Sequence, residues 1–165
     1  AADEDSERVL NAGVRLPRPL SPHLSARLAG CPIDLDALVN LPAETGAAPF
    51  IVEGAGGVLV PLNESALMVD LMVRLALPVI VVTRSGLGTI NHTLLTLEAL
   101  RARRLTIAGV LIVGPPNSDN REAIEQYGHA IVVGMLPTLD SLTPDTLAEA
   151  ASVIDPDCRL QTWLA

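Results

Sequence analysis

Residues 77–114 have the sequence LPVIVVTRSGLGTINHTLLTLEALRARRLTIAGVLIVG. An apolar run rich in β-branched residues (78–83) precedes a glycine-containing turn and a helical pattern (91–104), and a second apolar run (107–113) follows. The helical segment ends in arginines, which suit the negative end of a helix dipole. Neither run alternates apolar with polar residues, so both faces of the strands are expected to be covered. This order predicts a right-handed βαβ unit with a parallel sheet.

The alternation of strands and helices continues on both sides of this unit. Residues 49–52 and 130–133 are further apolar runs of strand length. Helical patterns are expected at 22–29, 35–41, 65–76, 120–128 and 143–152. We therefore predict an α/β fold, a parallel sheet between two layers of helices, in a single domain over residues 1–165. Because such sheets bind ligands beyond the carboxyl ends of their strands, functional residues are expected there.

The composition argues against several classes of function. Apolar residues make up 49% of the 165 residues and charged residues 18%, as in globular proteins. The formal net charge of −8 argues against nucleic acid or an anionic membrane as a partner, because both are bound through lysine and arginine. No apolar run approaches the roughly 18 residues of a membrane span, and no secretory signal is recognisable. A cytoplasmic protein is expected, with Cys31 and Cys158 as free thiols.

The first predicted strand runs directly into Glu53-Gly54-Ala55-Gly56-Gly57. A carboxylate at the end of a strand is suited to a hard cation such as Mg²⁺. The glycines allow backbone N–H groups to approach an oxyanion closely. The alternative is a glycine-rich turn with a solvated glutamate.

The second strand is followed by Gly86 and Gly88 at the start of the long helix. A helix start of this kind favours an anion, so we expect a carboxylate or phosphate site there. A dinucleotide site is disfavoured, because Asn91 occupies the place of the third glycine and the next strand ends in Val113-Gly114 rather than in an acid. His92 is expected to make a packing or backbone contact rather than to act in catalysis.

Lysine is absent from the sequence. Phosphoryl-transfer sites usually place a lysine on the transferred phosphate, so its absence bears on any catalytic role. The two remaining strand tips, at 113–117 and 134–140, have the composition of ordinary loops. The sequence contains no metalloprotease motif and no nucleophile elbow.

Several motifs in a fixed order resemble the dethiobiotin synthetases. VEGAGGVLVPL at 52–62 is similar to that family's VEGAGG-x-x-x-PL signature, and SPHLSA at 21–26 is similar to its SPH-x-x-A segment. GTINHTLLT at 88–96 and NREAI at 120–124 follow at the expected spacing. The resemblance covers about residues 16–150 of this chain.

The resemblance implies a P-loop-type α/β fold and a homodimeric cyclo-ligase. Its substrates would be 7,8-diaminopelargonate, CO2 and ATP, with Mg²⁺ accompanying the nucleotide. One amine of the substrate would form a carbamate, ATP would phosphorylate the carbamate to a mixed anhydride, and the second amine would close the ureido ring of dethiobiotin.

The resemblance also assigns roles to residues at the strand tips. Glu53 would bind magnesium. The substrate's carboxylate would lie at the helix start, across the dimer interface. The residues implied in ATP binding are Glu53, Gly54, Ala55, Gly56, Val113, Gly114, Pro137, Thr138 and Leu139, and those implied in substrate binding are Gly88, Thr89, Ile90, Asn91 and Tyr127.

Two features depart from the family pattern. The strand and GTDTxVGKT phosphate loop with which the family begins, and its Lys-Pro motif, are absent from this sequence, so it contains none of the family's catalytic residues. Val113 stands where the family usually has an asparagine that contacts adenine. Three interpretations follow: a fragment of an ordinary synthetase that is inactive by itself, a non-catalytic or split subunit that acts as a dimerisation module, or another P-loop ligase such as a cobyrinate amidase-type domain.

Overall fold

The computed structural model describes residues 13–41, 51–155 and 160–163. The chain divides into two compact units, each described by itself. The segment Pro78–Ala165 contains the sheet and is called the sheet unit, and the segment Ala2–Leu77 is called the helical unit. The single-domain organisation expected over residues 1–165 stays a prediction.

The sheet unit is built on three parallel strands in the order β1-β2-β3. The strand β1 (Val79–Arg84) leads into the helix α4 (Thr89–Ala102), and β2 (Ile107–Val113) follows. The third strand, β3 (Val132–Leu136), lies beside β2. This is the βαβ arrangement predicted for 77–114. A parallel sheet with flanking helices confirms the α/β class and is consistent with a P-loop NTPase-like domain.

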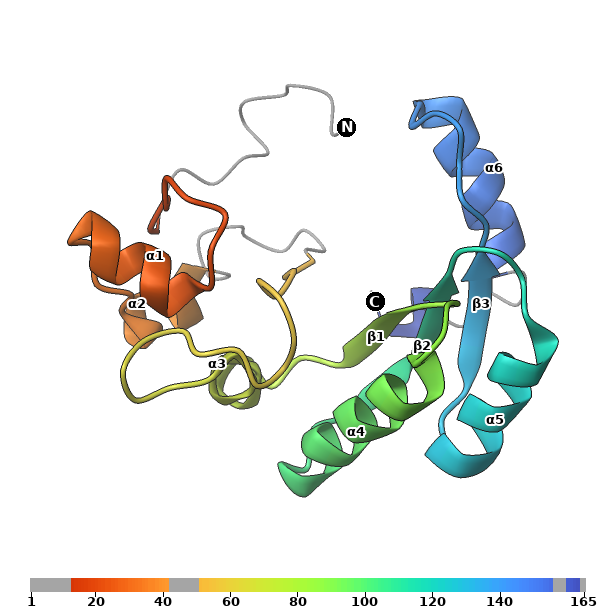
Figure 1. Cartoon of the computed structure of the whole chain (residues 1–165), viewed down its shortest axis with the longest axis horizontal. Helices are drawn as coiled ribbons and strands as arrows, with labels where there is room; N and C mark the ends of the chain where they lie inside the picture. The colour runs from red at the N-terminus through yellow and green to blue at the C-terminus, as the bar shows by residue number, and fades with distance from the viewer. Residues whose placement is uncertain (1–12, 42–50, 156–159, 164–165) are drawn as a thin grey trace. The chain divides into compact units, whose positions relative to one another are not determined.

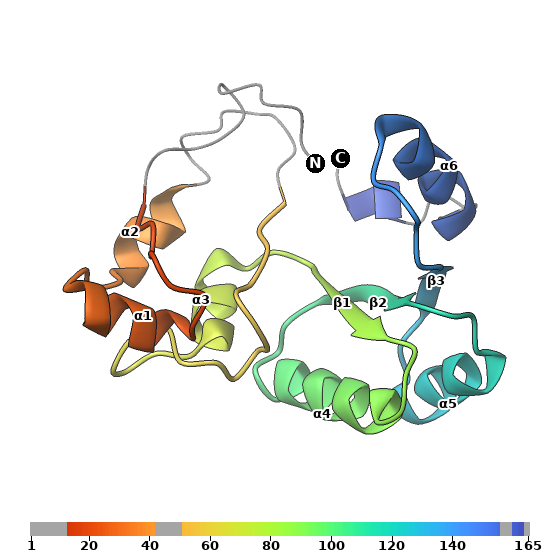
Figure 2. The same cartoon turned by 45° about the horizontal axis from the view of Figure 1, so that its top comes forward.

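Helices flank both faces of the sheet (Figures 1 and 2). The helices α4 and α5 (Ser118–Gly128) lie on one face, and α6 (Pro144–Ile154) lies on the other, against β3. A short 3-10 helix spans Leu160–Trp163. The fully buried side chains between the sheet and the first two helices are aliphatic: Leu97, Leu100, Val110, Ile112, Ile124 and Val132.

One face of β1 is less covered than the sequence predicted. Ile80 is 42% exposed and Val82 is 64% exposed, whereas Val81, which points to the α4 side, is 8% exposed. The expectation that both faces of every strand are covered is therefore wrong for β1. The reason is that α6 packs against β3 at the far side of the sheet.

The outer edge of β3 is closed by two charged side chains of α5. Glu125 Oε1 accepts the backbone N–H of Val132 at 3.2 Å, and Arg121 Nη2 donates to the backbone oxygen of Val132 at 3.2 Å. Arg121 and Glu125 also pair with each other at 3.4 Å. An edge strand otherwise presents unpaired backbone groups to other chains, so this pair protects the edge.

The helical unit contains α1 (Pro22–Ala29), α2 (Leu35–Asn40) and α3 (Met68–Leu75). Its core is formed by Leu62, Met68 and Leu71, against which side chains of α2 pack. An ion pair between Arg74 and Asp36 joins α3 to α2 at the surface.

The strand predicted at 49–52 is not formed where the structure describes it. Residues 51 and 52 have no regular secondary structure, and residues 49 and 50 lie outside the described residues. Ile51 is 87% exposed, and Val52 is 47% exposed. A strand needs a hydrogen-bonded neighbour, and none of the described strands pairs with this segment.

Cys31 is an exposed free thiol, as predicted, and Cys158 lies outside the described residues. In the described part of the chain, no helix is long and apolar enough to cross a membrane.

Candidate functional site

The tips of the three strands are joined by backbone hydrogen bonds beyond the strand ends. Ser85, just after β1, donates its N–H to the oxygen of Val113 at 2.9 Å. Gly114, just after β2, donates its N–H to the oxygen of Leu136 at 2.8 Å. The sheet thus supports the loops that the sequence predicted to be functional.

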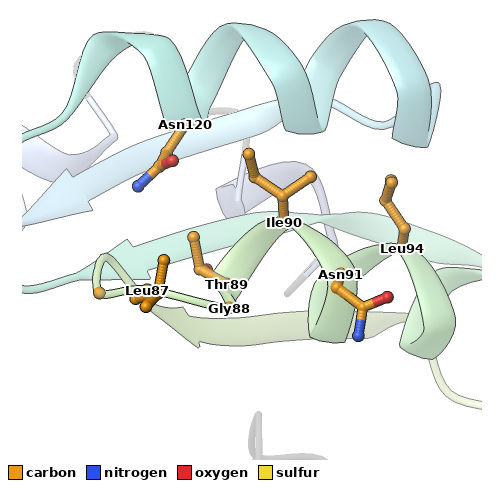
Figure 3. A pocket seen from close by; sticks show the side chains of 8 residues that line it. Leu87, Gly88, Thr89, Ile90, Asn91, Leu94 and Asn120 are labelled. Atoms are coloured by element: carbon orange, nitrogen blue, oxygen red, sulfur yellow. The ribbon is translucent and has the colours of Figure 1, made fainter.

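A hollow of about 450 Å³ lies between the turn after β1 and the start of α5 (Figure 3). Its lining is mainly apolar, with two asparagine side chains. The residues that line it are Gly86, Leu87, Gly88, Thr89, Ile90, Asn91, Leu94 and Asn120. The structure therefore brings together four of the five residues predicted to bind substrate, Gly88 to Asn91. Tyr127 is 66% exposed in α5 and is not among the lining residues.

The start of α4 leaves backbone donors open to this hollow. Gly88 precedes the helix with a φ of 88°, a left-handed conformation that glycine adopts without strain, and has no side chain to cap the helix. The N–H of Thr89 donates to Gly86 and that of His92 to Gly88. The N–H groups of Ile90 and Asn91 have no partner among the described residues. Two aligned N–H groups at the positive end of a helix dipole favour an anion.

Other helix starts in the chain do not have this property. A side-chain oxygen of the N-cap residue accepts a backbone N–H at the start of α2, α5 and α6, from Asp34, Asn117 and Thr143 respectively. The start of α4 is therefore distinguished both by its open donors and by the hollow around them.

The residues predicted to bind the nucleotide base lie at the tips of β2 and β3. Val113 and Gly114 are half-buried, Pro137 and Thr138 are exposed, and Leu139 is half-buried. Gly114 has a φ of 124°, and a Cβ atom there would lie 2.6 Å from Ser85 Oγ. Glycine is therefore required at 114 by both backbone conformation and space.

The glycine loop after residue 52 belongs to the helical unit. Glu53 is exposed, and Gly56 has a φ of 88°. The loop is fastened to α3, because the oxygens of Val58 and Val60 accept the N–H groups of Val69 and Met68 at 2.9 and 2.8 Å. Within the described ranges, no three histidine, cysteine, aspartate or glutamate side chains cluster as a metal site. One exposed carboxylate nevertheless fits Mg²⁺, which is commonly held by one or two carboxylates together with phosphates and water.

Sequence analysis missed two residues at the centre of this site. Asn120 was expected to cap α5, but Asn117 is the cap, and Asn120 instead donates from Nδ2 to the backbone oxygen of Ser85 at 2.9 Å. Ser85 is 9% exposed and was treated as part of the turn. No local signal identifies this pair, because the residues are 35 positions apart.

Comparison with known proteins identifies related sequences. A family model described as an AAA domain matches residues 1–146. The ATP-dependent dethiobiotin synthetase BioD of Paramagnetospirillum magneticum is 52% identical over 141 residues, which are 86% of this chain and 67% of that protein. The protein of the same name from Bradyrhizobium sp. is 42% identical over 151 residues, 92% of this chain and 71% of that protein.

The biotin biosynthesis bifunctional protein BioCD of Bordetella avium is 52% identical over 134 residues, which are 81% of this chain and 28% of that protein. The chain thus spans about two thirds of the length of the two synthetases, at 67% and 71%, and a smaller part of the bifunctional protein.

Proposed function

Because the chain belongs to the dethiobiotin synthetase family, a family of ATP-dependent ligases, we propose that it serves the closure of the ureido ring of dethiobiotin. The family resemblance drawn from the sequence motifs is confirmed by these relatives. The proposed substrates are 7,8-diaminopelargonate, CO2 and ATP, and the proposed setting is a cytoplasmic homodimer.

The open start of α4 is the observation that carries this proposal. The free N–H groups of Ile90 and Asn91 face a hollow and are suited to the carboxylate of 7,8-diaminopelargonate. The side chains of Ile90 and Leu94 line the same hollow and are suited to the alkyl chain of the substrate. An anion site beside an apolar lining matches a molecule with a carboxylate at the end of a hydrocarbon chain.

The other predicted residues are proposed to bind ATP. Val113, Gly114 and residues 137–139 would contact the nucleobase from the tips of β2 and β3. Glu53 would bind Mg²⁺, and Gly54, Ala55 and Gly56 would lie along the phosphates with their N–H groups. Mg²⁺ bound there would neutralise charge on the phosphates.

The residues of this chain are proposed to bind and orient rather than to transfer protons. Holding the carboxylate at α4 fixes one end of the diamine, so that its two amines lie at a constant distance from the nucleotide. Fixing reactants in this way contributes much of the rate enhancement in group-transfer reactions. The sequence has no lysine to place on the transferred phosphate, and no residue described here is assigned as catalytic.

The proposal is tested with the ¹⁵N-labelled chain and two ligands that differ only in charge. Titration with 7,8-diaminopelargonate is expected to shift the amide signals of Ile90 and Asn91, and titration with its methyl ester is expected to leave them nearly unchanged. Equal shifts with both ligands would exclude carboxylate recognition at α4, and no shift with either would exclude the hollow as the substrate site.

The absence of lysine favours a second candidate, a non-catalytic subunit or dimerisation module of the same family. In that case the chain would bind 7,8-diaminopelargonate and form dimers without consuming ATP. Phosphate release, measured with ATP, Mg²⁺, bicarbonate and the diamine present, separates the two: turnover by this chain would rule out the second candidate.

A further inference from the structure

The side chain of Asn120 bridges the hollow from α5 to the turn after β1 (Figure 3). Its Nδ2 donates to the backbone oxygen of Ser85 at 2.9 Å. The bond is partly buried, and its acceptor lies three residues before Gly88, where the open helix start begins. Asn120 therefore contacts the turn that determines where the donors of α4 point.

Ser85 is itself a junction between two loops. Its N–H is held by the oxygen of Val113, and its Oγ lies where any side chain at Gly114 would have to be. With its oxygen bound by Asn120, Ser85 is fixed on both sides of the backbone and at its side chain. Displacement of Ser85 would therefore disturb both the turn before α4 and the loop at Gly114.

Asn120 is held in place at its other end. Its backbone N–H donates to Asn117 Oδ1 at 2.9 Å, within the cap of α5. An asparagine amide offers donors and an acceptor on one short side chain, and here a donor is used across the hollow. A helix cap thus holds the side chain that supports the neighbouring turn.

We propose that Asn120 is a positioning residue for the substrate site. By binding the oxygen of Ser85, it holds the turn over Ser85 to Gly88 so that the N–H groups of Ile90 and Asn91 stay directed into the hollow. Through Ser85 it also keeps these donors in a fixed position relative to Gly114 in the proposed nucleotide loop. The consequence for substrate affinity rests on the proposed function, whereas the consequence for the turn does not.

The test compares Asn120→Asp with Asn117→Asp, the same chemical change three residues apart in α5. Aspartate at 120 has the shape of asparagine but only acceptors, so it repels the oxygen of Ser85. Aspartate at 117 remains an effective cap. We expect Asn120→Asp alone to speed amide hydrogen exchange over residues 85–91 by about tenfold, the effect of one lost hydrogen bond. Asn120→Ala is expected to act in the same direction.

Substrate affinity and thermal stability separate positioning from a general structural role. In the full chain, the Kd for 7,8-diaminopelargonate is expected to rise about fivefold to tenfold in Asn120→Asp, while its melting temperature stays close to that of Asn117→Asp. Unchanged exchange over residues 85–91 would overturn the proposal, and so would equal changes in both aspartate variants. If the unmodified chain does not bind the diamine, the proposed function fails, but the exchange comparison still decides the role of Asn120.

Discussion

Thr93 Oγ1, inside α4, donates a hydrogen bond of 2.9 Å to Thr83 Oγ1 in β1. The Thr83 hydroxyl lies at the same distance, 2.9 Å, from Thr89 Oγ1 at the start of the helix. Thr93 is 1% exposed and Thr89 is 5% exposed, so these bonds are shielded from water. The chain of three hydroxyls fastens the first turns of α4 to the strand that precedes it.

Replacement of Thr93 by valine tests this attachment. Valine keeps the shape and removes the donor, so we expect Thr93→Val to lower the free energy of unfolding by about 1 kcal/mol. Urea denaturation measures the change. Thr96→Val is the control, because the Thr96 hydroxyl only bonds back to the oxygen of His92 in the same helix; its effect should stay within about 0.5 kcal/mol. Equal losses in the two variants would contradict a special role for Thr93.

Gly88 is expected to be replaceable only at a cost. Its φ of 88° is strained for residues with a Cβ, so Gly88→Ala should lower stability by about 1–2 kcal/mol. Gly88→Asn should cost less than alanine, because asparagine tolerates the left-handed region better. The control is Gly86→Ala, since a Cβ at Gly86 meets no atom within 4 Å. The order Gly86→Ala, Gly88→Asn, Gly88→Ala in increasing loss is expected in urea denaturation, and any other order counts against the strain argument.

Gly134 in β3 is expected to set how closely α6 approaches the sheet. A Cβ at this position would overlap the backbone oxygen of Ile154 at the end of α6, and backbone atoms cannot rotate away. Gly134→Ala should therefore destabilise the chain by about 1–3 kcal/mol. Thermal and urea denaturation measure the loss, with Gly57→Ala as the unhindered comparison. A neutral Gly134→Ala would show that α6 is not packed at this distance in solution.

The edge of β3 provides a further prediction. Removing the Glu125 carboxylate leaves the N–H of the buried Val132 without its acceptor, so Glu125→Ala should cost about 1–2 kcal/mol. Glu122→Ala, one turn earlier on an exposed position of α5, should be nearly neutral. Size-exclusion chromatography is a second measurement, because an unprotected strand edge promotes association. Similar behaviour of the two variants would contradict the proposed protection.

Local sequence signals were sufficient for most elements of the sheet unit. The expected strand at 107–113 is β2 itself, and the expected strand at 78–83 differs from β1 by one residue at each end. The start of α6 was also predicted, because Thr143 caps it and proline occupies the first helical position. These features depend on neighbouring residues only.

Side-chain hydrogen bonds moved the other helix boundaries. The helix expected from residue 65 begins at Met68, because Asn63 Oδ1 accepts the N–H groups of Ser65 and Ala66 and forms a turn there. Asp70 then accepts the N–H of Leu67 at 2.8 Å, which fixes the start of α3. Each of several polar residues in this stretch could have been the cap, and the sequence does not rank them.

The candidate site was only partly predictable for a similar reason. The glycines before α4 indicated an anion site, since their effect on a helix start is local. The contact between Ser85 and Asn120 depends on the packing of α5 beside α4 and has no signature in either segment.

The strand tips have their geometry fixed by main-chain atoms, and this has an evolutionary consequence. The bonds from Ser85 to Val113 and from Gly114 to Leu136 involve only backbone groups. The side chain at position 113 is therefore free to diverge while the floor of the site keeps its shape. Valine at this position, in place of the family's usual asparagine, changes what a nucleotide base would meet without rebuilding the loop. Nucleotide preference is in this sense an exchangeable part, mounted on a frame that point mutations at residue 113 leave intact.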